Sequence, residues 1–373
     1  MLLAGLVAVV VLAVAAGLLY LFFYPEGDGG HDARPSSPGA IPLAVIGDSG
    51  SHAYQDQLAF PPGAPERGGA LRPHTFNWTE IVARLRGKEL DLGPWVEWGR
   101  PPMISWAREI IGLEGGRSPV KQDYLYNFAN SGATCTNLMG VGLRQRFHQV
   151  PRLIQMMDRD PELWKKGVVV IKIGAADWTD VLDAQARQPD APEVQKVINF
   201  CTEQIRDSIA AIHARHPSTH ILVVGVLNDS DDPAYDDRWQ SDQETANLQA
   251  ASDLFAASLR KLIEKTRNTS FFDDAEWSRH HWGAHSSPHK PFHNTITIGS
   301  LAVTNSAGDD PHNSVLADHH ASLGWNALWA QSVVDQLRRD FKLPLTPISD
   351  QELADFVMST VQPTIQAAPP PAK

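Results

Sequence analysis

Short apolar runs alternate with longer amphipathic segments along the chain from about residue 41 onward. Residues 43–47, 168–174 and 221–226 are runs in which nearly every position is apolar and many are β-branched. Residues 124–129 form a further run that is mostly apolar. Continuous apolar strands are typical of a parallel sheet that is covered on both faces. The pattern therefore predicts four strands of such a sheet.

Segments with helical periodicity separate and follow these runs. They span residues 138–158, 194–215, 241–266 and 321–339. In 241–266, apolar residues recur at spacings of three and four, namely Leu248, Ala251, Leu254, Phe255, Leu259 and Leu262. Alternating strands and helices predict a doubly wound α/β domain, which we place at residues 41–345. In such sheets, chemistry gathers at the carboxyl ends of the strands.

Residues 1–24 are apolar and carry no charged side chain. As a helix this segment would be roughly 35 Å long, enough to cross a hydrocarbon core of about 30 Å. Its length and its bulky end favour an uncleaved transmembrane signal-anchor, with a cleaved signal peptide as the alternative. Residues 25–40 are rich in Pro, Gly and Ser and predict a flexible linker. Residues 346–373 predict a C-terminal helix and a Pro-rich tail.

We expect the globular part to lie outside the cytoplasmic membrane, in a periplasmic or other extracytoplasmic space. A large domain after a single N-terminal span is most simply exported, although neither flank has the Lys and Arg excess that marks the cytoplasmic side. The 373 residues include 32 Lys and Arg against 43 Asp and Glu, a net charge of −11. This balance argues against a nucleic-acid partner, which needs a basic surface. It also disfavours polybasic attachment to anionic lipid.

The chain has two cysteines, Cys135 and Cys201. Two cysteines provide neither a disulfide framework nor the spacing of a zinc site. We interpret them as buried thiols, with a single disulfide as the alternative in an oxidising compartment.

Four short polar motifs follow predicted strands or precede the last helix. Residues 47–49 (Gly-Asp-Ser) end the first strand, 130–134 (Asn-Ser-Gly-Ala-Thr) follow the second and 174–178 close the third. Residues 318–320 (Asp-His-His) lead into the final helix. An imidazole beside a carboxylate can serve as a general base for a serine hydroxyl. Each motif alone is an ordinary turn or helix cap, but their order along the chain is specific.

In this order, the motifs resemble the blocks of the GDSL/SGNH hydrolase superfamily. That family places its nucleophile in a Gly-Asp-Ser block, a glycine after the second strand, Gly-x-Asn-Asp after the third and Asp-x-x-His before the last helix. The resemblance covers most of residues 41–340. It implies a flavodoxin-like, three-layer α/β/α fold and a serine esterase without metal or organic cofactor. It also implies that Ser49 is the nucleophile and that the N–H groups of Ser49 and Gly132 stabilise the oxyanion.

The sequence departs from this family pattern in its third block. The asparagine that donates to the oxyanion would fall at Ala176, whose methyl group cannot donate. Deleting one such donor typically costs about 10²–10³ in turnover. Asn228, which follows the fourth predicted strand, is a candidate substitute.

A second departure concerns the acid and the base. Alignment of the last block selects His320 as the base, with Asp318 two residues before it instead of three. A competing pair, Asp309 and His312, has the Asp-x-x-His spacing. We favour His320 because the final helix should begin directly after the base.

Two other polar clusters are weaker candidates for a functional site. Five histidines lie close together, namely His280, His281, His285, His289 and His293. They lie in a predicted loop without a zinc-like frame, so we predict no metal there and disfavour a metal-dependent phosphoesterase. The acidic stretch 229–237 lacks the glycine-centred order of a calcium loop, and we predict a solvated loop.

The predicted function is hydrolysis or transfer of an O-acyl group through a serine acyl-enzyme. The predicted location indicates an acylated glycan or lipid of the cell envelope as the substrate. The alternative is a degenerate domain of the same fold that binds an envelope glycan or a protein partner without turnover. Ala176 and the displaced Asp318 support that alternative.

Overall fold

The computed structural model describes residues 2–23, 27–28, 37–113, 115–140, 148–239, 241–285 and 292–367. Its centre is a five-stranded parallel sheet with the order β3-β2-β6-β7-β8. These strands are β2 (Ile41–Gly47), β3 (Leu90–Asp91), β6 (Val168–Lys172), β7 (His220–Val224) and β8 (Thr269–Phe272). Numbered along the chain, the five strands have the order 2-1-3-4-5, which is the flavodoxin-like order that was predicted.

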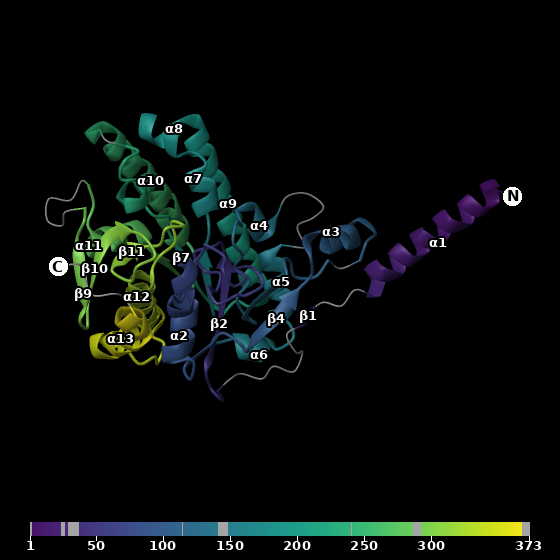
Figure 1. Cartoon of the computed structure of the whole chain (residues 1–373), viewed down its shortest axis with the longest axis horizontal. Coiled ribbons are helices and arrows are strands. Elements are labelled where there is room, and N and C mark those ends of the chain that lie inside the picture. The colour runs from purple at the N-terminus through teal and green to yellow at the C-terminus, as the bar shows by residue number, and fades with distance from the viewer. Residues whose placement is uncertain are drawn as a thin grey trace.

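Side chains of the central strands alternate between two hydrophobic cores. In β2, Leu43 and Val45 face one core, whereas Ala44 and Ile46 face the other. The helices that close the first core include α2 (Trp78–Arg86), α12 (Leu323–Phe341) and α13 (Asp350–Ala367). Those that close the second include α5 (Gln149–Met157), α9 (Pro192–Arg215) and α10 (Asp242–Ile263). Figure 1 shows α9 and α10 on one side of the sheet and α12 and α13 on the other, so the domain has three layers.

The strand predicted at 124–129 is not a strand of this sheet. Strand β5 (Lys121–Tyr124) belongs to a small antiparallel sheet with β1 (Gly27–Asp28) and β4 (Trp95–Gly99). Beyond β5, the chain meets β2 at a single bridge between Asn127 and Val45. The side-chain amide of Asn127 bonds locally and so competes with a regular ladder. The predictions at 43–47, 168–174 and 221–226 are confirmed as β2, β6 and β7.

Most of the predicted helices are present. Segments 194–215, 241–266 and 321–339 are confirmed as α9, α10 and α12, and α13 is the predicted C-terminal helix. The single helix predicted at 138–158 is wrong, because α4 (Thr136–Met139) ends at Gly140 and α5 begins at Gln149. Gly140 has φ 72°, which is typical of a residue that ends a helix. Residues 141–147 and the predicted tail at 368–373 lie outside the described residues.

A second three-stranded sheet, which was not predicted, precedes α12. Its strands are β9 (Thr295–Ile298), β10 (Leu301–Ala307) and β11 (Asn313–Val315). The turn between β11 and α12 carries Asp318 and His320. The remaining helices are α3 (Pro102–Ile110), α6 (Pro161–Trp164), α7 (Ala175–Thr179), α8 (Leu182–Arg187), α11 (Asp274–Trp282), η1 (Gly69–His74), η3 (Asp229–Asp231) and η4 (Pro233–Tyr235).

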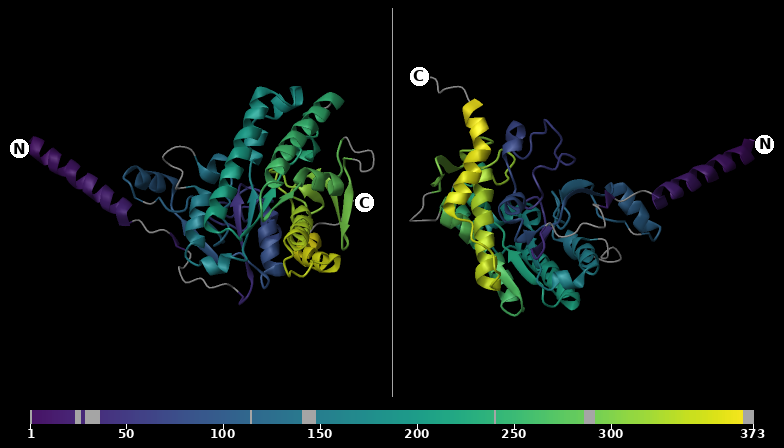
Figure 2. Two further views of the ribbon diagram at one scale, coloured as in Figure 1. Left: turned by 180° about the vertical axis from the view of Figure 1, so that it is seen from behind. Right: turned by 90° about the horizontal axis from the view of Figure 1, so that it is seen from below.

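The N-terminal segment forms helix α1 (Leu2–Phe23), which projects from the globular part in both views of Figure 2. Arg108 of α3 donates to the main-chain oxygen of Leu21 and so connects the two. In the part of the chain that the structure describes, no helix is long and apolar enough to span a bilayer. The helix predicted for residues 1–24 is therefore present, but its transmembrane character is not supported.

Candidate active site

A cavity of about 340 Å³ opens at the carboxyl ends of β2, β6 and β7. The residues singled out in the sequence that line it include Ser49, Gly132, Ala176 and His320. The cavity lies beside the point where the strand order reverses, which is where doubly wound sheets bind their ligands. Its volume is in the usual range of small-molecule sites, about 300–1,000 Å³.

Gly47 lets the nucleophile turn approach the neighbouring strand closely. A Cβ atom at this position would lie 2.1 Å from the main-chain oxygen of Lys172, so only glycine fits. The buried side chain of Gln149 donates to the Gly47 oxygen and accepts from its N–H, both at 2.8 Å. These contacts fix the end of β2 from two sides.

Asp48 connects the nucleophile turn to the third block. Its carboxylate accepts from the N–H of Gly50 at 3.0 Å and from the N–H of Ala175 at 3.3 Å. Burial raises the pKa of Asp48, although the charge of Lys172 opposes this effect. Ser49 follows as a half-buried residue at the cavity wall. The Gly-Asp-Ser sequence thus places its serine hydroxyl at the edge of the sheet.

The block that contains Gly132 is tied to the same turn. Asn127 donates to the main-chain oxygen of Ser51 at 2.8 Å. Gly132 has φ 77°, a left-handed conformation that glycine adopts without strain. The N–H of the preceding Ser131 donates to Nδ1 of the buried His52 at 3.1 Å. Sequence analysis missed His52, although it lies only three residues after the serine of the Gly-Asp-Ser turn.

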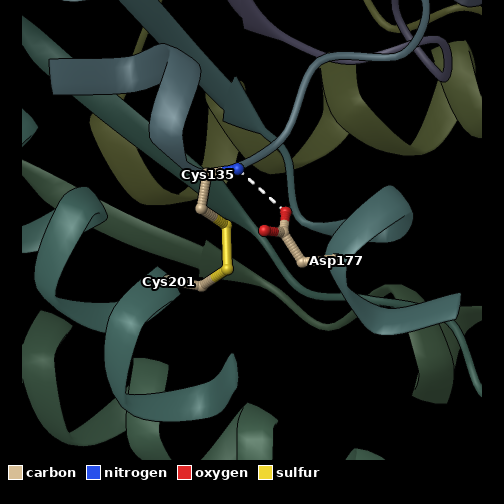
Figure 3. A group of neighbouring side chains, drawn as sticks. All are labelled: Cys135, Asp177 and Cys201. Atoms are coloured by element: carbon tan, nitrogen blue, oxygen red, sulfur yellow. Dashed lines mark hydrogen bonds between the residues drawn. A yellow bond between two sulfur atoms is a disulfide. The ribbon is translucent and has the colours of Figure 1, made fainter. Parts of the chain in front are cut away.

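A disulfide holds the downstream end of this block (Figure 3). Cys135 is bonded to Cys201 of α9, with 5.2 Å between their Cα atoms, so the prediction of two thiols is wrong. Figure 3 also shows the Cys135 N–H donating to the carboxylate of Asp177, at 2.8 Å. Asp177 belongs to the third block, which is thereby connected to the second. Because both sulfurs are in the disulfide, this cluster offers no thiolate for a metal.

Asp318 and His320 lie against each other despite their short spacing. Nδ1 of His320 is 2.9 Å from the main-chain oxygen of Asp318 and 3.3 Å from its Oδ1. Burial alone would raise the pKa of Asp318, but the hydrogen bond and charge of His320, together with the charge of Arg67, outweigh it and hold the pKa well below its usual range. The carboxylate therefore stays ionised beside the imidazole.

The competing pair lies elsewhere. His312 is exposed and pairs with Asp310, with 2.6 Å between Nδ1 and Oδ1. Asp309 accepts from the N–H of Ala317 at 3.1 Å and lines a separate small depression. Neither Asp309 nor His312 lines the cavity that holds Ser49.

Ala176 lines the cavity at the start of α7, where the family asparagine would lie. Asn228 lines it too, but it is not oriented to substitute. Its amide nitrogen donates to Asp231 at 2.9 Å and to Gln249 at 3.0 Å. One acceptor lies in the loop and the other in α10, so both hydrogens of the amide are engaged and Asn228 does not replace the missing donor.

The acidic stretch was wrongly predicted to be solvated along its length. Asp229, Asp231 and Asp232 line the cavity, and Asp231 is buried. Burial, followed by the charge of Asp232, raises the pKa of Asp229 to about 8, and burial raises that of Asp231 to about 6. The position of the stretch directly after the fourth predicted strand was a signal that could have placed it at this edge.

Two histidines of the cluster pack against aromatic rings. His281 stacks on Trp277 and bonds to its main-chain oxygen, and His285 stacks on Phe292. His280 and His281 lie within α11 and not in the predicted loop. His289 lies outside the described residues.

A serine, a glycine block and an imidazole–carboxylate pair at the carboxyl edge of a parallel sheet are the groups that a serine hydrolase needs. The GDSL-like Lipase/Acylhydrolase family matches residues 43–322, and the chain belongs to this family. The protein is therefore a serine ester hydrolase. No curated protein matches the chain.

Three solved structures are also similar to the chain. A lipase from a goat rumen metagenome is 10% identical, with a TM-score of 0.33 over 66% of this chain and 87% of its own. An acetylxylan esterase from Geobacillus stearothermophilus is 12% identical, with a TM-score of 0.35 over 80% and 95%. An alpha/beta hydrolase from the metagenome of Lake Arreo, Spain, is 15% identical, with a TM-score of 0.35 over 79% and 95%. Since these TM-scores are below 0.5, the assignment depends on the family match alone.

Proposed function

We propose that this enzyme hydrolyses or transfers O-acyl groups of a cell-envelope glycan or lipid, with Ser49 as nucleophile. In this proposal His320 is the general base and Asp318 the acid that orients it. The observation that carries the proposal is that Ser49, Gly132 and His320 line one cavity. Asp318 contacts the imidazole at Nδ1, which leaves Nε2 for the serine.

The proposed reaction follows from these contacts. Asp318 keeps the proton on Nδ1, and Nε2 of His320 accepts the proton of Ser49 while Oγ bonds to the acyl carbon. The carbonyl oxygen becomes negative and faces the N–H groups of Ser49 and Gly132. The ester C–O bond then breaks, and the leaving alkoxide takes the proton from His320. Water or an acceptor hydroxyl, deprotonated by the same imidazole, releases the acyl group and restores Ser49.

Replacement of the nucleophile tests this proposal. Against an activated acetyl ester, Ser49→Ala should lower kcat/KM by about 10⁴–10⁶, the range seen when a catalytic serine is removed. A fluorophosphonate probe should label the wild type once and leave Ser49→Ala unlabelled. Ser300→Ala, which alters an exposed serine in the turn between β9 and β10, is the matched control and should behave as the wild type. Equal ester hydrolysis by wild type and Ser49→Ala would contradict the proposal.

We also propose that residues 1–24 attach the enzyme to a membrane, with the globular part on the oxidising side. Helix α1 has no charged residue, and its described side chains include exposed Leu12 and Phe23, 69% and 71% accessible. The Cys135–Cys201 disulfide is of the kind that persists in oxidising compartments. On fractionation, the full chain should sediment with membranes and be released by detergent. Recovery in the soluble fraction would exclude this attachment.

A further inference from the structure

Arg67 is a buried arginine beside the acid and the base. It is 3% exposed, and its guanidinium lies over the rings of Tyr54 and Phe60, 5.3 and 4.5 Å from their centroids. Its φ of 59° is in the left-handed region, which is unfavourable for a residue with a side chain. A buried charge on a strained backbone persists only where specific partners hold it.

The partners of Arg67 are the acid, the base and the Gly132 block. Its N–H and its Nη1 both donate to Oδ2 of Asp318, the N–H at 2.9 Å. Nη1 also lies 2.8 Å from Nδ1 of His320. Nη2 donates to Oγ of Ser131 at 3.1 Å. One side chain therefore contacts both halves of the candidate site.

The short spacing between Asp318 and His320 explains why this support is needed. The Asp318 carboxylate contacts His320 at Nδ1 and at the main-chain N–H. Both contacts are long, at 3.3 Å, and both involve Oδ1. The two donors of Arg67 act on the other oxygen, Oδ2, so the carboxylate keeps Oδ1 toward the imidazole. Because a guanidinium can only donate, the 2.8 Å contact from Nη1 makes Nδ1 of His320 an acceptor in this arrangement. Once Nδ1 carries a proton, Nη1 bonds to Oδ2 of Asp318 alone, and Arg67 and His320 are then two donors on one acid.

The buried His52–Asp56 pair holds Ser131, which in turn contacts Nη2 of Arg67. Because the N–H of Ser131 donates to Nδ1 of His52, that nitrogen carries no proton, and Nε2 donates to Oδ2 of Asp56 at 2.9 Å. Burial, assisted by the charge of Lys121, lowers the pKa of His52 and favours this neutral form. Oγ of Ser131, 3.0 Å from Nδ1, donates to His52 and accepts from Arg67. The chain of contacts thus runs from Asp56 to His320.

We propose that Arg67 is a positioning residue for the Asp318–His320 pair, and that Ser131 and His52 hold Arg67 in place. This inference rests on the proposed function, because it concerns the same acyl transfer. Arg67 does not line the cavity, so it acts through the acid and the base and not on the substrate. Its removal should lower kcat and leave KM nearly unchanged, because ground-state binding is not altered.

Arg67→Gly is the most direct test. Glycine adopts φ 59° without strain and keeps the backbone N–H on Asp318, so only the guanidinium is lost. We expect kcat for an activated acetyl ester to fall about 10²-fold, the cost of a small misplacement of catalytic groups. Methylguanidine at about 10 mM, far below the molar denaturant range, should restore part of kcat in this variant but not in the wild type. Arg84→Ala, which removes an arginine that stacks on Phe76 instead, is the control and should keep wild-type kcat.

Arg67→Lys separates charge from geometry. Lysine keeps the charge but lacks the planar fork that reaches Asp318, His320 and Ser131 together, so kcat should fall between wild type and Arg67→Gly. If Arg67→Gly does not fold, the kcat of Arg67→Lys tests the inference, provided that the melting temperature of Arg67→Lys equals that of the wild type. A kcat within threefold of wild type in either folded variant would overturn the inference, as would a loss in Arg67→Gly that methylguanidine does not reduce. If wild type does not exceed Ser49→Ala, the proposed function itself fails, and the role of Arg67 fails with it.

Discussion

The two sides of the cavity differ in how firmly their functional groups are held. On the acid–base side, Asp318 and His320 contact each other and a buried arginine that is itself bonded to Ser131. On the oxyanion side, the third block presents the methyl group of Ala176 where the family has a donor. The amide of Asn228 donates to Asp231 and to Gln249 of α10. In the proposed mechanism, the acid–base pair is therefore held by an additional arginine, whereas the oxyanion lacks the side-chain donor expected at Ala176.

This contrast shows that a departure from a motif has different meanings on the two sides. The short Asp-x-His spacing is a change of backbone, and Arg67 supplies new contacts to the displaced carboxylate. The loss of the asparagine at Ala176 is a change of chemistry, and a methyl group cannot acquire a proton to donate. A rearranged site can retain its activity through new contacts, but a missing donor lowers the rate unless another takes its place.

The largest expected effect is the loss of kcat when the proposed base, His320, is removed. His320→Ala should lower kcat by about 10⁴–10⁶, as removal of a catalytic base does, because Nδ1 of His320 contacts Asp318 and the residue lines the cavity. His312→Ala should stay within twofold of wild type, since His312 is exposed and pairs with Asp310. Steady-state hydrolysis of an activated acetyl ester measures both. The reverse outcome would assign the base to the Asp309–His312 pair.

The second largest expected effect is the gain in kcat when a side-chain donor is added on the oxyanion side. Ala176→Asn should raise kcat by at most about 10²–10³, because the new amide would serve a charge that exists only in the transition state. Ala257→Asn is the control, since it makes the same change at an exposed alanine of α10 that does not line the cavity. The gain should vanish in the Ser49→Ala background. An unchanged kcat in Ala176→Asn would mean that the site already has a sufficient set of donors.

The smallest effect concerns the acidic loop beside Asn228. In the unfolded chain Asp229 ionises near pH 3.8, whereas in the folded protein its carboxyl group stays protonated up to about pH 8. The folded protein therefore loses stability as pH rises through that window, because the unfolded chain releases this proton and the folded protein does not. Asp229→Asn removes this penalty. Its melting temperature should equal that of wild type near pH 4 and exceed it by about 3 °C at pH 8–9, the shift that about 1 kcal/mol produces.

The exposed Asp237, in the same stretch, provides the control for that measurement. Asp237→Asn should leave the melting temperature unchanged at both pH values, because the Asp237 side chain is exposed and lies outside the cavity. An equal shift in both variants would show that the effect of Asp229→Asn comes from net charge and not from burial.

Local patterns in the sequence predicted what local physics determines. The apolar runs before Ser49 and Ala176 indicated β2 and β6, and their carboxyl ends indicated where these residues meet. The contacts of Arg67 could not be read in this way, because Arg67 and Asp318 are 251 residues apart. Likewise, the segment at 124–129 has the composition of a strand, but the bonds of Asn127 to Ser51 and Asp123 hold it as a turn. Such polar contacts between distant segments leave no periodic signal.

The attachments of the Gly132 block also have an entropic consequence. The segment is fastened on one side by the bond from Ser131 to His52, and on the other by the Cys135–Cys201 disulfide. A loop restrained at both ends has few alternative conformations left to lose when a substrate arrives. In the proposed mechanism, the N–H of Gly132 therefore meets the developing oxyanion already ordered. The loss of chain entropy occurs during folding and oxidation, and it is not repeated at each turnover.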